Sequence, residues 1–122
     1  MANFKVIYRA DSESSEHPIL WELGCPLIFD AIQISRNTET GEAFLQIKLR
    51  NLTNSIVNSF ALDIRVEYES EDPEILNSRQ LDADIPPAGE YTVKPIKLAH
   101  GDAVGVEAGI AKCVFNDVSW AS

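Results

Sequence analysis

Apolar and polar residues alternate along most of the chain, and a period of two predicts β-strands. The clearest case runs over residues 60–68. Successive side chains of a pleated strand point to opposite faces, so five apolar side chains share one face: Phe60, Leu62, Ile64, Val66 and Tyr68. The intervening Asp63, Arg65 and Glu67 would face water. We predict a strand with one side in a hydrophobic core and the other in solvent.

A hairpin is predicted ahead of this strand. Residues 43–51 repeat the alternation, and residues 28–35 form a second apolar segment. The connection at residues 37–42 contains Asn, Thr and Gly, which is typical of a hairpin turn in which Gly41 takes a positive φ. We expect the two strands to pair antiparallel. With the strand ending at Tyr68, they would form a three-stranded meander.

Proline and glycine place the later boundaries. Pro73, among acidic neighbours, ends the long strand because proline cannot donate a hydrogen bond to a ladder. The Pro-Pro-Ala-Gly stretch at residues 86–89, rigid and then flexible, predicts a sharp connection between strands. Pro95 predicts an edge strand or a bulge, and Gly105 and Gly109 predict a bend or a close backbone approach. The strands involved are predicted at residues 81–85, 91–98 and 103–115.

The N-terminal residues are harder to assign. Residues 4–8 fit an edge strand, residues 11–16 are polar and predicted to be mobile, and residues 18–21 fit one helical turn or a strand equally well. The pattern contains six strands, or seven to eight with the N-terminal ones. We predict a single domain over residues 1–122, an all-β, immunoglobulin-like antiparallel sandwich of two sheets, in which residues 1–18 are an edge strand followed by a mobile segment.

The charge of the chain narrows the class of partner. The net charge is -9 and the pI is near 4.5, which disfavours nucleic acid and anionic membrane as partners. Between Glu67 and Glu90 eight acids stand against one base, Arg79. We interpret this acidic segment as a solvated strand end and loop that keeps the protein soluble. A cation site and a basic partner remain the alternatives.

Export and membrane signals are not found in this sequence. No apolar run approaches the roughly 20 residues that cross a bilayer, and residues 1–9 lack the pattern of a cleavable leader. We therefore expect a cytoplasmic protein. Its two cysteines, Cys25 and Cys113, form no C-x-x-C pair, and we expect reduced, buried thiols. A bridge between them would require their Cα atoms within about 7 Å and stays an open question.

Motifs that carry chemistry are sparse. His17 and His100 have no partner at zinc-ligand spacing, and the glycine-rich loops that bind phosphates are missing. His100 and Asp102 could join a serine in a triad, although the stretch is typical of an exposed loop. We therefore predict no enzyme, no catalytic, cofactor-binding or metal-binding residues, and no cofactor.

Two weaker motifs have ordinary explanations. The crowded acids Glu69, Glu71, Asp72 and Glu74 could attract calcium, but they lack the spacing of an EF-hand loop. Asn51-Leu52-Thr53 matches the N-glycosylation triplet. We interpret Asn51 and Thr53 as residues whose side chains close a turn.

Four segments between Cys25 and Trp120 carry a family resemblance: Cys25-Pro26-Leu27-Ile28, Thr40-Gly41-Glu42, Leu45 to Val57, and Val114 to Trp120. They resemble a family of uncharacterised bacterial domains, best known from Firmicutes, in composition and order. The resemblance implies an immunoglobulin-like β-sandwich, in some members joined to zinc-ribbon-like modules, and it implies no known activity. Residues 116–119 replace the serine-aspartate-glycine turn of that family.

These observations favour a non-catalytic interaction or accessory module that presents sheet edges and loops to a protein partner. The identity of the partner and the oligomeric state are left open by the sequence. The alternative is a small-ligand-binding or hydrolytic protein with a site at the loop end of the sandwich.

Overall fold

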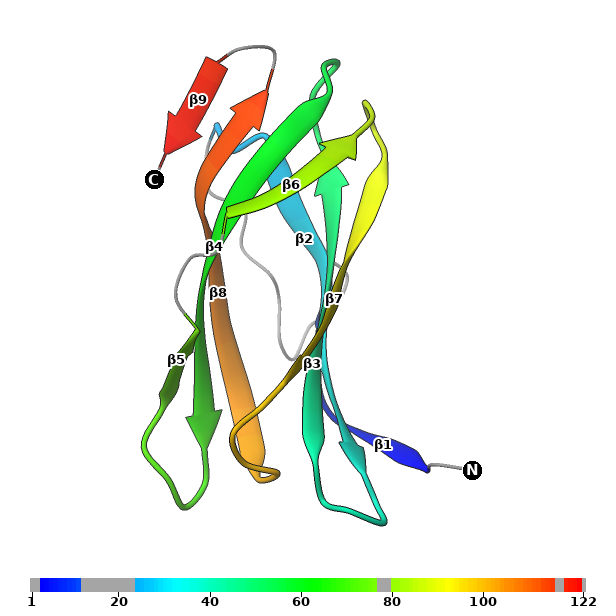
Figure 1. Ribbon diagram of the computed structural model, residues 1–122, viewed down its shortest axis with the longest axis vertical. Helices are drawn as coiled ribbons and strands as arrows, with labels where there is room; N and C mark the ends of the chain where they lie inside the picture. The colour runs from blue at the N-terminus through cyan, green and yellow to red at the C-terminus, as the bar shows by residue number, and fades with distance from the viewer. Residues whose placement is uncertain (1–2, 12–23, 77–79, 116–117, 122) are drawn as a thin grey trace.

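The computed structural model describes residues 3–11, 24–76, 80–115 and 118–121, and within them the chain forms strands and no helix. Two antiparallel sheets pack face to face (Figure 1). The predicted all-β, two-sheet sandwich is confirmed. None of the described segments forms a long apolar helix of the kind that crosses a bilayer.

Sheet A has the strand order β1-β2-β3-β7. Its strands are β1 (Phe4–Asp11), β2 (Leu27–Asn37), β3 (Ala43–Asn51) and β7 (Glu90–Lys97). Sheet B has the order β5-β4-β8-β9, and β6 also pairs with β4. Its strands are β4 (Val57–Tyr68), β5 (Glu74–Leu76), β6 (Gln80–Ile85), β8 (Ala103–Phe115) and β9 (Val118–Ala121).

The predicted hairpin is confirmed. Strands β2 and β3 pair antiparallel, with Ile32 opposite Ile47. In the turn, Gly41 has a φ of 77° and its N–H donates to the carbonyl of Asn37. The side chain of Asn37 also accepts hydrogen bonds from the backbone N–H groups of Glu39 and Thr40. A short polar side chain and a glycine thus satisfy the turn within itself.

The predicted meander is wrong. Strand β4 does not join β3 but crosses to the other sheet, where it pairs with β5, β6 and β8. Both edges of β3 are occupied by β2 and β7, so no edge is left for β4. The alternation of apolar and polar residues predicts which face of a strand is buried but not which strand pairs with it. The crossing of β4 to sheet B could therefore not be predicted from the sequence pattern.

The core lies between the two sheets and contains the predicted face of β4. All five apolar side chains from Phe60 to Tyr68 are buried, whereas Asp63 and Arg65 are exposed. Inward-facing side chains of β3 meet them from sheet A, and they include Leu45, Ile47 and Leu49. The one-sided burial that alternation predicted is therefore confirmed for both strands.

The predictions from the proline in β7 and the glycines in β8 are partly confirmed. Pro95 lies in the edge strand β7, at a register shift between the pairs Leu45–Ile96 and Ile47–Val93, as predicted. The β4–β8 register shifts beside Gly105, between the pairs Glu67–Gly105 and Tyr68–Ala103, so the strand is locally irregular at this glycine. No described atom lies within 4 Å of a Cβ built on Gly105 or Gly109, so the close backbone approach is not found in the described structure.

The N-terminal prediction is confirmed for β1, which pairs with β2 and extends to Asp11. The predicted mobile segment at residues 11–16 is wrong for Asp11, which is the last residue of β1; residues 12–16, like residues 18–21, lie outside the described residues.

Candidate functional site

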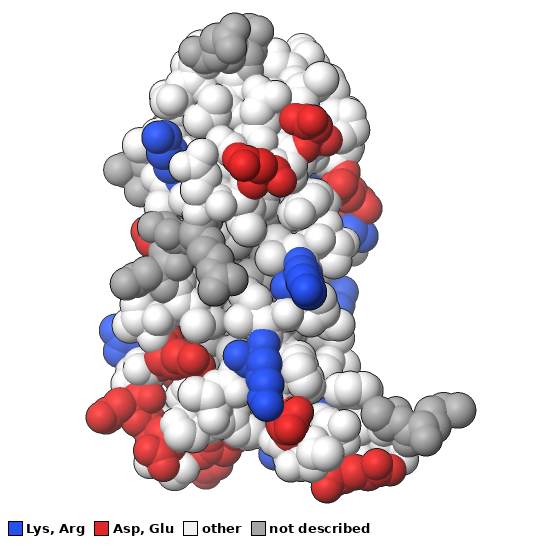
Figure 2. Space-filling model, viewed as in Figure 1, with Lys and Arg blue, Asp and Glu red and all other residues white. Residues whose placement is uncertain are grey.

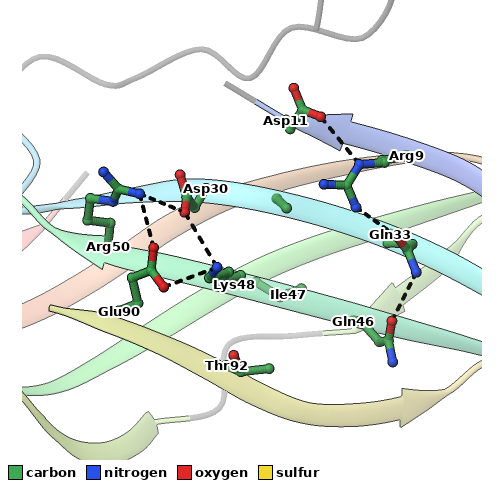
Figure 3. A pocket seen from close by; sticks show the side chains of 11 residues that line it. Arg9, Asp11, Asp30, Gln33, Gln46, Ile47, Lys48, Arg50, Glu90 and Thr92 are labelled. Carbon is green, nitrogen blue, oxygen red and sulfur yellow. Dashed lines mark hydrogen bonds and ion pairs between the residues drawn. The ribbon is translucent and has the colours of Figure 1, made fainter. Parts of the chain in front are cut away.

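A shallow groove of about 590 Å³ crosses the outer, solvent-facing side of sheet A (Figure 3). All four strands of the sheet contribute to it. Its lining consists of Arg9, Asp11, Asp30, Ala31, Gln33, Gln46, Ile47, Lys48, Arg50, Glu90 and Thr92. Apart from Ala31 and the core residue Ile47, these lining residues are the polar half of the alternation whose apolar half builds the core. Ala31 and Thr92 are the small side chains of the lining.

An ion-pair cluster occupies one end of the groove. The guanidinium of Arg50 donates to both Asp30 and Glu90, at 3.0 Å each. The ammonium of Lys48 lies 3.0 Å from Glu90 and 4.0 Å from Asp30. The hydrogen bond from Lys48 lowers the pKa of Glu90, and the hydrogen bond to Asp30 raises the pKa of Arg50. Because these groups are solvated, their pairing orients side chains more than it stabilises the fold.

A chain of hydrogen bonds continues from β1 to β3. The guanidinium of Arg9 contacts Asp11 at 3.3 Å and donates to the side-chain carbonyl of Gln33 at 2.7 Å. The amide nitrogen of Gln33 donates in turn to Gln46 at 3.2 Å and to Ser35 at 3.1 Å. Figure 3 shows Asp11, Arg9, Gln33 and Gln46 in one row across the strands. The groove therefore presents oriented donors and acceptors rather than loose side chains.

The groove lining is electrically neutral although the chain is strongly acidic. Its three cations, Arg9, Lys48 and Arg50, match its three carboxylates, Asp11, Asp30 and Glu90. Acidic side chains gather elsewhere, over the lower ends of β4 and β5 in Figure 2. A partner approaching the groove therefore meets little of the repulsion that the net charge of -9 would impose on an anion elsewhere.

An apolar cluster lies on the same outer side of sheet A, toward the N-terminal end of β1. Phe4 is 56% exposed and Val6 is 49% exposed. The ring of Phe4 packs edge-on against Phe44 with centroids 6.1 Å apart. Val6 is opposite Ser35, whose hydroxyl accepts the hydrogen bond from Gln33, so the apolar cluster adjoins the groove. We call the groove together with Phe4, Val6 and Phe44 the sheet A face.

The acidic segment is partly structural. Glu74 accepts hydrogen bonds from the hydroxyl of Tyr68 at 2.5 Å and from the backbone N–H of Ala99 at 3.1 Å. Burial of Tyr68, followed by its hydrogen bond to Glu74, raises the pKa of the phenol to about 12. In the described part of the chain no three His, Cys, Asp or Glu side chains come together as a metal site. The calcium alternative gains no support from this arrangement.

The residues of the imagined triad do not adopt its geometry. Asp102 accepts hydrogen bonds from both the backbone N–H and the hydroxyl of Ser70, and the second bond lowers the pKa of Asp102 most. The ring of His100 packs edge-on against Tyr68 at 5.0 Å instead of lying between the serine and the acid. A triad needs histidine to accept the proton of the serine hydroxyl. Here the serine instead joins the β4–β5 connection to Asp102.

The interpretation of Asn51 as a turn-closing residue is confirmed. Its side chain is buried, at 1% exposed, and it donates to the carbonyls of Ser55, Ile85 and Pro86. Its side-chain oxygen accepts from both the backbone N–H and the hydroxyl of Thr53. Asn51 therefore holds the turn after β3 against the β6–β7 connection.

Both cysteines are buried, as predicted, and the structure contains no disulfide between them. Burial raises the pKa of the Cys113 thiol to about 12, and Cys25 adds to this rise through its charge.

The sheet A face was not predicted from the sequence. The polar positions of β2 and β3 were visible in the alternation, but the contributions of β1 and β7 depend on strand order and register, which alternation does not report.

No family model, curated protein or solved structure matches the chain.

Proposed function

We propose that the protein is a non-catalytic interaction module and that it binds a protein partner through the sheet A face. The observation that carries this proposal is the exposed pair Phe4 and Val6 beside a neutral groove whose polar side chains already hold one another. We also propose that the sandwich is immunoglobulin-like and related to the Firmicutes domains that the sequence resembles.

The composition of the sheet A face matches the anatomy of protein interfaces. Such interfaces have an apolar, often aromatic centre and a polar rim. A few aromatic anchors carry most of the binding energy. Phe4 supplies an exposed aromatic ring that Phe44 already supports, so little side-chain freedom remains to be lost on binding. The paired charges of the groove supply the rim.

Catalysis has less support among the described residues. The serine, histidine and aspartate that could form a triad are engaged in structural contacts at the β4–β5 and β7–β8 connections. The thiols are buried. The groove lies on a sheet face rather than at the loop end, where the alternative of a hydrolytic or small-ligand site would place it.

A capture experiment with matched variants tests this proposal. Immobilised wild-type protein, Phe4→Ala and Ile75→Ala are incubated with extract of the source cells, and retained proteins are identified by mass spectrometry. Ile75 is the control because it is 56% exposed, like Phe4, but lies in β5 of sheet B. The affinity of a purified partner is then measured for each protein by calorimetry.

We expect Phe4→Ala to weaken binding at least about tenfold, since loss of a central aromatic anchor costs about 2 kcal/mol or more and each 1.4 kcal/mol is about tenfold in affinity. Ile75→Ala should bind within about twofold of wild type. Equal affinities of all three proteins would place the interface elsewhere and overturn the proposal.

A further inference from the structure

The two cysteines approach the core from opposite sheets. Cys25 stands two residues before β2 of sheet A, and Cys113 belongs to β8 of sheet B. Cys25 is 3% exposed, Cys113 is fully buried, and both are members of one core cluster. They are also the only cysteines of the chain. Two thiols that are 88 positions apart in sequence thus lie within a single apolar environment.

The surroundings of the two cysteines are shared. Cys113 is directly opposite Trp120 in the β8–β9 pairing, and Trp120 packs against the core. Gly24, the residue before Cys25, lies against the same tryptophan: a Cβ on Gly24 would be 3.9 Å from its indole nitrogen. The segment that carries Cys25 therefore passes over the end of sheet B that carries Cys113. The electrostatic interaction with Cys25 also contributes to the raised pKa of the Cys113 thiol.

The closed structure protects these thiols. The thiolate is the reactive form of cysteine, and a buried thiol with a raised pKa is inert. Reaction therefore requires an opening that admits water and a small oxidant. Of the two strands that pair with β8, which carries Cys113, β9 is the one most suited to open, because it has four residues, pairs with β8 alone among the described strands, and begins at the exposed Val118.

We propose that Cys25 and Cys113 are a buried dithiol that oxidises to an intramolecular disulfide when β9 opens. The oxidant is a small-molecule disulfide. One protein thiolate attacks it, releases the first small thiol and forms a mixed disulfide, and the other protein thiolate displaces the second small thiol. Two protein S–H bonds are lost, one protein S–S bond forms, and the small disulfide is reduced to two thiols. The product joins the segment before β2 to β8 and so links the two sheets.

The first experiment asks whether this bond forms. Wild-type protein, Cys25→Ser and Cys113→Ser are incubated with oxidised glutathione, and intact masses are measured with and without a reductant. We expect wild type to lose two hydrogen atoms, to remain a monomer, and to melt at least about 5 °C higher, because a disulfide that closes a long loop restricts the unfolded chain. The reductant should reverse both changes.

The serine variants should instead retain a glutathione adduct, because the second thiol is missing. Wild-type protein that ends as a glutathione adduct, as an intermolecular dimer, or unmodified even after incubation at a mildly destabilising urea concentration would overturn the proposal.

The second experiment asks whether β9 controls the reaction. Val118→Gly weakens β9 without removing a core side chain, and Val104→Gly is its control on β8, because Val104 is similarly exposed. At equal concentrations of oxidised glutathione, we expect Val118→Gly to form the disulfide at least about five times faster than Val104→Gly, even after their melting temperatures are matched with urea. Equal rates would show that global unfolding, and not the opening of β9, exposes the thiols.

Discussion

Replacement of Asn51 by alanine should be among the most damaging single changes at a polar residue. The side-chain amide nitrogen of Asn51 donates to three carbonyls, those of Ser55 at 2.7 Å, Ile85 at 3.0 Å and Pro86 at 3.2 Å. Its oxygen accepts from the N–H and the hydroxyl of Thr53, at 2.8 Å each. One residue thus satisfies the backbone of two connections that come from different parts of the chain.

The size of the stability loss depends on how well water can replace each hydrogen bond that Asn51 makes. The contact with Ile85 is buried, and a buried carbonyl left without a donor costs about 1 to 3 kcal/mol. The remaining bonds are partly buried, so water can compensate, and each contributes about 0.5 kcal/mol net. The four partly buried bonds add about 2 kcal/mol to the buried one, so we expect Asn51→Ala to lower the free energy of unfolding by about 3 to 5 kcal/mol.

Urea denaturation followed by tryptophan fluorescence measures this loss. Asn58→Ala is the control: Asn58 is exposed and makes one 3.4 Å contact to Asp84, so its replacement should change stability by less than about 0.5 kcal/mol. A loss below about 1 kcal/mol for Asn51→Ala, or equal losses for the two variants, would refute the structural role of Asn51.

Three further predictions concern the core, a tight contact and alkaline pH. In urea denaturation, Ile64→Ala should lower the free energy of unfolding by about 2 to 5 kcal/mol. Arg65→Ala, on the solvent-exposed face of β4, should lower it by less than about 0.5 kcal/mol. Comparable losses would mean that both faces of β4 are buried. Gly101→Ala should destabilise by about 1 to 3 kcal/mol, because its Cβ would lie 2.1 Å from the carbonyl oxygen of Gly41, while Gly109→Ala has open space and should be tolerated. Because the fold raises the pKa of Tyr68 from 10 to about 12, the phenol contributes stability that is complete below pH 10 and is lost between pH 10 and 12. Tyr68→Phe should therefore show a smaller alkaline loss than wild type, by at most about 2 to 3 kcal/mol, and identical pH profiles would contradict this coupling.

Local patterns predicted the fold class and several of its parts. The burial of the five apolar side chains of β4 and the conformation of the turn around Gly41 depend on residues close in sequence, so both could be predicted from the local pattern. Strands β5 and β9 were not predicted, because three or four residues are too few to show an alternating pattern. The crossing of β4 to sheet B escaped it because partner choice depends on packing across the whole domain.

The candidate site was less accessible to prediction for a related reason. Gln33 and Gln46 are 13 positions apart and meet through the β2–β3 register, but Arg9 and Glu90 join them only through β1 and β7. Asn51 was recognisable as a turn residue, yet its bond to Ile85 spans 34 positions and needs the fold. Contacts between distant segments set the sheet A face, and no single segment of the chain reports them.

The most direct measurement of the central claim is an NMR titration of isotope-labelled protein with its purified partner. If the sheet A face is the binding surface, amide signals of Phe4, Gln33 and Gln46 should shift or broaden on binding. Signals of Arg65 and Glu107, on the outer side of sheet B, should stay in place. Shifts confined to β4, β5 and β8 would contradict the claim.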